Sequence, residues 1–169
     1  MNTDQVGTDH IDRMVNDWAR TAPDLDTTPL QVAGRLLRCA AHLQRMIDDA
    51  LEQLDLSYGD FDVLNTLRRR GDPDGTNPKA LAASALITSG AMTSRLDRLE
   101  TAGLIERRPD PADRRGVLVV LTPAGRERAT RALDAVLVAD RHFLEPLGPD
   151  DQRTVATTLK RLLLGAEPG

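Results

Sequence analysis

Cysteine, aromatic residues and long apolar runs are all scarce in this chain of 169 residues. The single cysteine, Cys39, excludes an intrachain disulfide and fits a reducing cytoplasm. No uninterrupted apolar run approaches the roughly 20 residues of a membrane-spanning helix. The N-terminal residues MNTDQVGTDHIDRM are polar and acidic, which is unlike a signal peptide. We therefore expect a cytoplasmic protein with no membrane partner.

Aromatic residues make up only 2% of the chain, so leucine, valine, alanine and isoleucine must fill its core. A core of that composition favours helices that pack through aliphatic ridges. The sequence has no glycine-rich phosphate loop, nucleophile elbow or catalytic-triad pattern. Its three histidines are too scattered to form a zinc site. We expect neither an enzyme nor a bound metal or cofactor.

The apolar residues that are present recur mostly at helical spacing. They predict helices over 10–20, 29–56, 57–67, 79–86, 88–102, 123–142 and 150–164. In the last helix an inward face is expected for Val155, Leu159, Leu162 and Leu163. Two strands, 104–108 and 116–121, are predicted to form a hairpin around the loop 109–115. The expected fold is mainly α with a small β-hairpin, in a single domain spanning 1–169.

The fourth and fifth predicted helices are joined by a tight turn, which is typical of a helix-turn-helix. A hairpin directly after such a pair makes a winged helix. The second helix begins with SGAMTS (89–94), whose side chains are small enough for its backbone to approach the major groove of DNA. Met92 is expected to face the core. Three side chains can donate to phosphates or base edges: Ser89, Thr93 and Ser94.

The net charge of -4 argues weakly against a nucleic-acid partner, but the distribution of charge matters more than its sum. Residues 79–116 hold seven basic and five acidic side chains, so this stretch carries +2 and the remainder carries -6. Affinity for DNA depends on local neutralisation of phosphates. The charge pattern is therefore compatible with DNA binding by this central stretch.

The stretch KALAASALITSGAMTSRLDRLETAGLIERR, followed by DPADRRG and LTP, resembles the multiple antibiotic resistance regulator (MarR) family. The resemblance extends over about residues 30–165. It implies a homodimeric winged helix-turn-helix transcription factor that represses from a palindromic operator in double-stranded DNA. In that architecture 10–56 and 123–165 form the long N- and C-terminal dimerisation helices, and 57–122 form the DNA-binding core.

The wing signature of the family is Asp-x-Arg, which Asp113 and Arg115 match. The resemblance implies that Arg115 reaches the minor groove, whose negative potential attracts arginine. It also implies that Asp113 supports that arginine and that Arg114 contacts a phosphate or a second groove position. The alternative is that these arginines form a solvated loop and that Ser89 only caps a helix. The order of elements around the motif favours DNA contact.

The chain resembles in detail a branch of the family that has an extra N-terminal helix and responds to urate and other small anions. The shared features are a tryptophan followed by ARTAPDLD, then DFDVL, TSRLDRLE and ERR. By this resemblance the anion-binding set falls on Trp18, Asp62, Arg95 and Arg107. Two arginines can neutralise an anion, and tryptophan offers a stacking face. The implied effector is a small anion such as urate or a tricarboxylate, whose binding lowers DNA affinity.

Alternatives remain open for several of these residues. Trp18 also suits simple packing, and Asp62 with Arg95 also suits a structural ion pair, while Arg95 also suits a direct DNA contact. Cys39 suits either an oxidant sensor, as in a redox-responsive branch of the family, or a buried structural cysteine. A different class of function is a helical interaction protein whose winged helix does not touch DNA.

Overall fold

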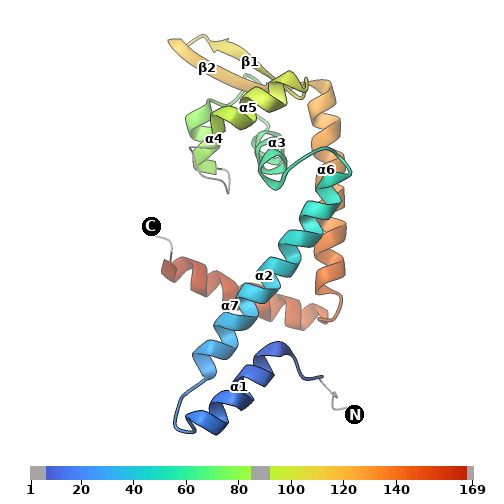
Figure 1. The fold of residues 1–169 in the computed structure, drawn as a ribbon. Coiled ribbons are helices and arrows are strands. Elements are labelled where there is room, and N and C mark those ends of the chain that lie inside the picture. Colours follow the sequence, from blue (N-terminus) through green and yellow to red (C-terminus); the bar gives the residue numbers. More distant parts are fainter. Residues whose placement is uncertain (1–6, 85–91, 167–169) are drawn as a thin grey trace. The chain divides into compact units, whose positions relative to one another are not determined.

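The computed structural model of the chain describes residues 7–84 and 92–166, which form seven helices and one β-hairpin (Figure 1). The backbone divides into two compact units, Met1–Arg45 and Met46–Gly169, with the boundary inside the second helix. Within the described residues no helix combines the length and the apolarity needed to cross a bilayer. The mainly helical class with a small hairpin is confirmed.

The first unit is built from α1 (His10–Thr21) and most of α2 (Thr28–Glu52). A capping box begins α1: the Asp9 carboxylate accepts the Asp12 N–H at 2.8 Å, and the Asp12 carboxylate accepts the Asp9 N–H at 2.9 Å. Arg35 of α2 binds both carboxylates, at 2.9 Å and 2.6 Å. These ion pairs link the start of α1 to α2.

In the second unit, α3 (Tyr58–Arg70) packs on α5, α6 and β2. It begins at a capping box formed by Ser57 and Asp60, whose two reciprocal hydrogen bonds are both present. It ends at Gly71, whose φ of 62° is the left-handed conformation that glycine adopts without steric cost. Its buried apolar side chains are Phe61, Val63, Leu64 and Leu67.

The helix-turn-helix consists of α4 (Pro78–Ser84) and α5 (Met92–Thr101). The hairpin that follows pairs β1 (Ile105–Asp110) with β2 (Asp113–Leu121) in antiparallel register. An isolated bridge between Thr76 and Val119 adds a third short edge beside β2. The outer edge of the hairpin is therefore β1.

The predicted loop over 109–115 is wrong, because Asp110 already pairs with Asp113. Two features extend the hairpin beyond its expected end. The Asp110 carboxylate accepts the Ala112 N–H at 2.8 Å, which closes a tight turn. Pro109 is tolerated in the strand because an outer edge needs no donor on its solvent side. The signature residues Asp113 and Arg115 consequently lie on a strand rather than in a loop.

The chain ends with α6 (Pro123–Leu144) and α7 (Pro149–Ala166). Thr122 caps α6: its Oγ1 accepts the Gly125 N–H at 2.9 Å and donates to the Gly103 carbonyl at 2.7 Å. The inward face predicted for the last helix is wrong for a single chain, because α7 has no buried residue. Among the four side chains of that face, three are exposed: Val155, Leu162 and Leu163.

Candidate functional site

The hairpin tip presents an arginine to solvent. Arg115 is exposed, and its backbone N–H donates to the Asp113 carboxylate at 2.9 Å. The carboxylate thus holds the backbone of the tip rather than the arginine side chain. In the described part of the chain the Arg115 guanidinium has no carboxylate partner, so its donors are available to a ligand. Arg114 lies on the same strand, and its side chain is outside what the structure describes.

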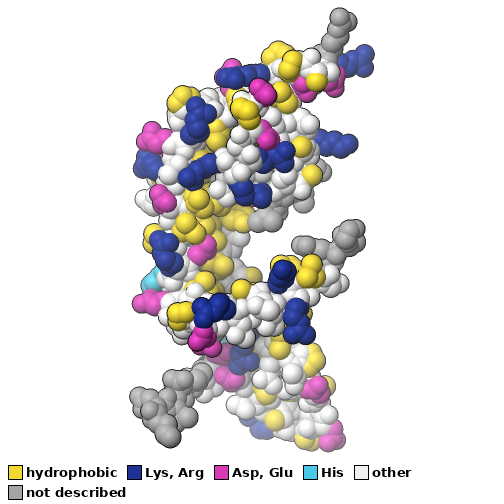
Figure 2. Space-filling view, turned by 180° about the vertical axis from the view of Figure 1, so that it is seen from behind, with side chains coloured by type: hydrophobic (Ala, Val, Ile, Leu, Met, Phe, Trp, Pro, Cys, Tyr) yellow, Lys and Arg dark blue, Asp and Glu magenta, His cyan; other side chains and the backbone are white. Residues whose placement is uncertain are grey.

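The first turn of α5 presents short hydroxyl side chains. Thr93 and Ser94 are exposed, whereas Met92 is buried, as predicted. Ser89 lies outside the described residues. Side chains of this size let the start of a helix approach a nucleic-acid groove closely. Figure 2 shows several Lys and Arg side chains, interspersed with Asp and Glu, over the winged-helix elements in the upper part of that view.

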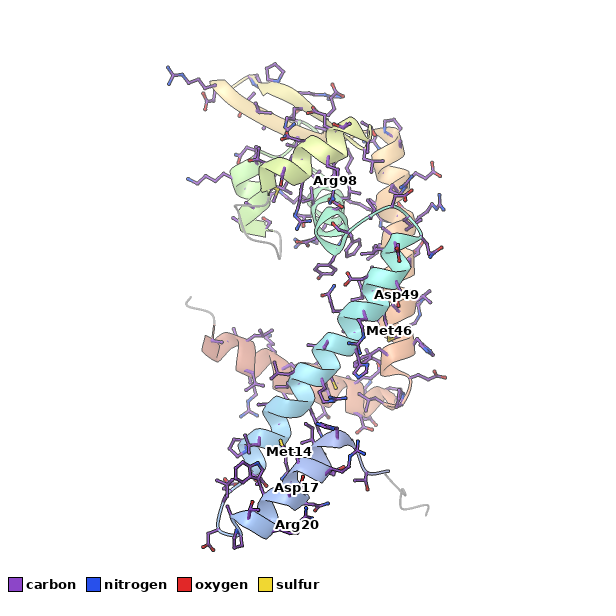
Figure 3. All side chains as sticks on the ribbon, viewed as in Figure 1. Met14, Asp17, Arg20, Met46, Asp49 and Arg98 are labelled. Atoms are coloured by element: carbon purple, nitrogen blue, oxygen red, sulfur yellow. The ribbon has the colours of Figure 1, made fainter. Side chains whose placement is uncertain are left out.

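A polar cluster joins the start of α3 to α5. Arg98 of α5 forms an ion pair with Asp60 and donates to Ser57 Oγ at 3.0 Å (Figure 3). Arg95, one turn earlier, donates to the same Oγ at 3.2 Å. Within the described residues, Asp60 Oδ1 and Arg95 Nε are buried without hydrogen-bond partners. Buried polar atoms of this kind are rare in folded proteins and mark a place that a polar ligand can satisfy.

Two local features hold this cluster. Burial on its own raises the pKa of Asp60, but hydrogen bonds from Arg98 and Ser57 outweigh it and keep that pKa below its usual value. Gly59 makes room for Arg95, since a Cβ added there would collide with the guanidinium. The cluster is therefore charged at neutral pH and depends on a glycine for its geometry.

Arg107 lies on β1 and binds different partners. Its guanidinium contacts the carboxylate of Asp97 at 2.6 Å and also that of Glu100. Burial on its own lowers the pKa of Arg107, but the bonds to these two carboxylates outweigh it and raise the pKa. Arg95 and Arg107 thus hold separate partners. An anion shared between them has to compete with Asp97 and Glu100.

Asp62 of α3 is 6% exposed. Burial raises the pKa of the Tyr58 hydroxyl, and the negative charges of Asp62 and Asp140 raise it further. Burial also raises the pKa of Asp140 on α6, against a smaller opposing effect of Arg141. Asp62 and Asp140 therefore act on the same phenol from two different helices.

The remaining predicted residues belong to the first unit. Trp18 on α1 is 41% exposed, so its ring is only partly packed. Cys39 on α2 is also exposed, so its interpretation as a buried structural cysteine is wrong for the single chain. Across residues 7–84 and 92–166, no group of three His, Cys, Asp or Glu side chains is placed to hold a metal ion.

Arg98, Ser57 and Asp60 were not predicted from the sequence as members of this cluster. One signal points to Arg98: it lies three residues after Arg95, and residues at that spacing share a helix face. The spacing of Ser57 and Asp60 along the chain indicates a helix start, which the structure has. Their second use as acceptors for arginines from α5 depends on tertiary packing.

Comparison with known proteins identifies the family. Residues 54–116 match the MarR family. Over 152 residues the chain is 34% identical to the HTH-type transcriptional regulator PecS of Dickeya dadantii, covering 90% of this chain and 92% of PecS. The chain belongs to the MarR family. It is a MarR-family transcriptional regulator rather than an enzyme, as predicted, whereas membership of the anion-responsive branch stays a prediction.

Other MarR-family proteins show the same architecture. The HTH-type transcriptional repressor Rv2887 of Mycobacterium tuberculosis is 33% identical over 138 residues, covering 81% of this chain and 95% of the repressor. The structure of an E. coli MarR mutant complexed with operator DNA superposes with a TM-score of 0.69 at 28% identity, covering 86% of this chain and 97% of that one. The structure of Rv2887 complexed with DNA gives a TM-score of 0.61 at 31% identity, covering 77% and 95%. The winged-helix prediction is confirmed.

Proposed function

We propose that the chain is a homodimeric repressor that binds a palindromic operator and is released from it by a small anion. The wing carries the proposal: Arg115 is exposed at the tip, and Asp113 holds its backbone. The wing directly follows α5, whose first turn exposes Thr93 and Ser94. The DNA complexes of MarR and Rv2887 support this use of the fold. We place the activity in the cytoplasm, which the single cysteine also favours.

Replacing Arg115 tests the wing. Arg115→Ala should weaken binding to a palindromic duplex about tenfold or more, because a specific arginine contact contributes about 1–3 kcal/mol. Fluorescence anisotropy across a salt series measures this loss, and one phosphate contact fewer also reduces the salt slope by about 0.9. Arg20→Ala, an exposed arginine of α1, removes the same charge as a control. Undiminished DNA affinity in Arg115→Ala removes the wing from the proposal and favours the helical interaction protein.

A second copy of the chain accounts for apolar side chains that one copy leaves exposed. Leu37 of α2 is 72% exposed and Leu164 of α7 is 69% exposed. Further members of this exposed apolar set are Leu36, Leu137, Val138, Leu162 and Leu163. Burying one leucine contributes about 1.5–3 kcal/mol, so pairing such faces favours a dimer.

Sedimentation equilibrium tests the dimer. Leu163→Glu should shift the chain toward a monomer, because it places a charge within the exposed apolar face of α7. Thr154→Glu adds the same charge at an exposed position on the side of that helix opposite Leu163 and should leave the dimer intact. If Leu163→Glu dimerises as fully as the control variant and the wild type, this face of α7 is not part of the interface.

We assign the effector to the polar cluster between α3 and α5. Arg95 supplies a buried Nε without a partner, and it lies on the helix that also exposes Thr93 and Ser94. Asp62 lies buried in α3. Arg107 joins when the anion draws it from its carboxylate partners. Trp18 lies in the first unit, and only the sequence resemblance includes it in the anion-binding set.

An anion held by Arg95 acts directly on the reading helix, and we expect it to lower the affinity for DNA. Linkage then requires that DNA lower the affinity for the anion by the same factor. Calorimetric titration with urate and with citrate tests the assignment. Arg95→Gln should weaken binding of the active anion about tenfold, because a charge-assisted hydrogen bond is lost. Arg141→Gln, an exposed arginine of α6, is the control. If neither anion binds, the effector proposal is wrong while the DNA proposal stands.

A further inference from the structure

A cavity of about 530 Å³ is lined by residues from the end of α3, the loop after it, the hairpin and the start of α6. Its volume is within the range of small-molecule sites. Buried side chains form part of its lining: Leu67 is 6% exposed and Val119 is fully buried. The apolar lining residues are Leu67, Pro73, Val119, Val120, Leu121 and Pro123.

Both acidic side chains of the cavity are already paired. Glu106 binds Arg108 at 3.0 Å, and the bond from Arg108 lowers the pKa of Glu106. Asp72 accepts hydrogen bonds from Thr76 at 2.7 Å and from Arg70 at 2.9 Å, which lower its pKa. The carboxylates of the lining are therefore ionised and occupied at neutral pH.

Two arginines of the lining remain without an acidic partner. In the part of the chain that the structure describes, neither Arg68 nor Arg126 has a carboxylate within ion-pair distance. Arg126 Nη1 donates to the Leu121 carbonyl at 2.8 Å, which holds the guanidinium at the cavity wall. The lining therefore holds three arginines against two carboxylates, and this surplus of positive charge favours an anionic occupant.

The start of α6 adds to this potential. Thr122 and Pro123, at its N-terminus, line the cavity, and the helix runs for 22 residues. A helix N-terminus carries about half a positive charge, which acidic residues in the first turn normally offset. The first turn of α6 contains no acidic residue. Helix and arginines therefore attract the same kind of group.

We propose that this cavity binds a small organic anion that joins an oxyanion group, phosphate monoester or carboxylate, to an apolar body. The oxyanion lies between Arg68 and Arg126 at the start of α6, and the apolar body lies on Pro73, Leu121 and Pro123, which are apolar lining residues with accessible surface. This cavity is separate from the polar cluster between α3 and α5. Alternate residues of a strand point to opposite faces, so Glu106 and Arg108 line the cavity whereas Arg107 faces α5.

Calorimetric titration of the full chain tests the proposal with four probes. Phenyl phosphate and cyclohexanecarboxylate combine both features and represent the two oxyanion sources. Inorganic phosphate has only the charge, and phenol has only the apolar body. At least one of the combined probes should bind at least tenfold more tightly than both single-feature probes. Comparable affinity for inorganic phosphate would overturn the apolar half of the proposal, and failure of both combined probes would overturn it entirely.

Two variants locate the binding. Arg68→Gln and Arg126→Gln should each weaken the bound probe about tenfold, because each removes a charge-assisted hydrogen bond. Arg68 is exposed and makes no ion pair in the described chain, so its replacement leaves the fold intact even if Arg126→Gln does not. Arg107→Gln should leave the affinity unchanged, which separates this site from the proposed effector site. Unaltered probe binding in Arg68→Gln, or a loss confined to DNA affinity, would overturn the proposal and assign the arginine to DNA.

Discussion

Asp60 is the side chain whose replacement tests the polar cluster most directly. Its side chain is 3% exposed, and its Oδ2 accepts three hydrogen bonds, from Ser57 N at 2.9 Å, from Ser57 Oγ at 2.6 Å and from Arg98. Asp60→Asn keeps the shape and removes the charge. We expect the free energy of unfolding to fall by about 3–6 kcal/mol at pH 7.

Three contributions make up this magnitude. Charge-assisted hydrogen bonds exceed neutral ones by about 1 kcal/mol each, and an acidic side chain in the first turn contributes about 0.3–1 kcal/mol more. The Arg98 partner is 57% exposed, so solvent screens that pair and it contributes at the low end. An amide nitrogen placed at the Oδ1 position becomes a buried donor without a partner, which costs about 1–3 kcal/mol.

The pH dependence has a definite sign. Burial raises the pKa of Asp60, but hydrogen bonds from Arg98 and Ser57 outweigh it, so the folded pKa lies below the ordinary value of 3.8. Such a carboxyl stabilises the fold above pH 3.8, and the contribution is lost as the pH falls through the folded pKa. The difference in stability between wild type and Asp60→Asn should be constant from neutral pH down to about pH 5 and shrink below pH 4.

Urea unfolding followed by circular dichroism, at one protomer concentration, measures these stabilities. Asp74→Asn, at an exposed loop position, is the control and should change stability by less than about 0.5 kcal/mol. Equal stability of Asp60→Asn and wild type at pH 7, or a difference that persists unchanged below the ordinary pKa, would refute the reasoning.

Three further substitutions probe how glycine and threonine position these elements. Gly59→Ala should change the free energy of unfolding by no more than about 1 kcal/mol but weaken anion binding about tenfold by calorimetry, because the new Cβ displaces the flexible Arg95 guanidinium. Gly7→Ala, at an exposed position, is the control. Unchanged anion affinity in Gly59→Ala would show that anion binding does not depend on this position of Arg95. Gly125→Ala should lower the melting temperature, because its Cβ would collide with the Leu104 carbonyl. This clash costs more than the roughly 1 kcal/mol by which alanine stabilises a helix relative to glycine. A higher melting temperature would contradict that geometry. Thr122→Ala should lower the free energy of unfolding in urea by about 1–3 kcal/mol, because both Oγ1 hydrogen bonds are lost. Thr122→Ser retains both bonds and is the control. An equal loss of stability in the two variants would assign the effect to the methyl group.

Local chemistry explains why much of the fold was predictable. Helix starts at Ser57 and Thr122 follow from side chains that reach only three residues along the chain. The burial of Leu64 and Leu67 follows from the helical period, which needs no knowledge of the partner element. Both signals lie in one short window of sequence.

The failures have a tertiary origin. The hairpin loop came out too long because Pro109 usually ends a strand, and only the free outer edge of β1 makes it acceptable there. The apolar face of α7 has no cover within one chain, so periodicity alone assigned it to a core that the single chain does not have. Arg98 was missed because its partner Asp60 is 38 residues away in sequence. Pairing over such a separation is set by how α3 and α5 pack.

Strand β1 connects the two proposed ligand sites. Arg107 points to α5 and its carboxylates, while Glu106 and Arg108 line the cavity on the other side. The same strand leads directly to the tip where Arg115 is exposed. An anion on either side has to move or restrain β1 in order to affect the wing. Because coupling free energy is reciprocal, each anion must change the affinity for the other by the same factor, and that factor is measurable without DNA.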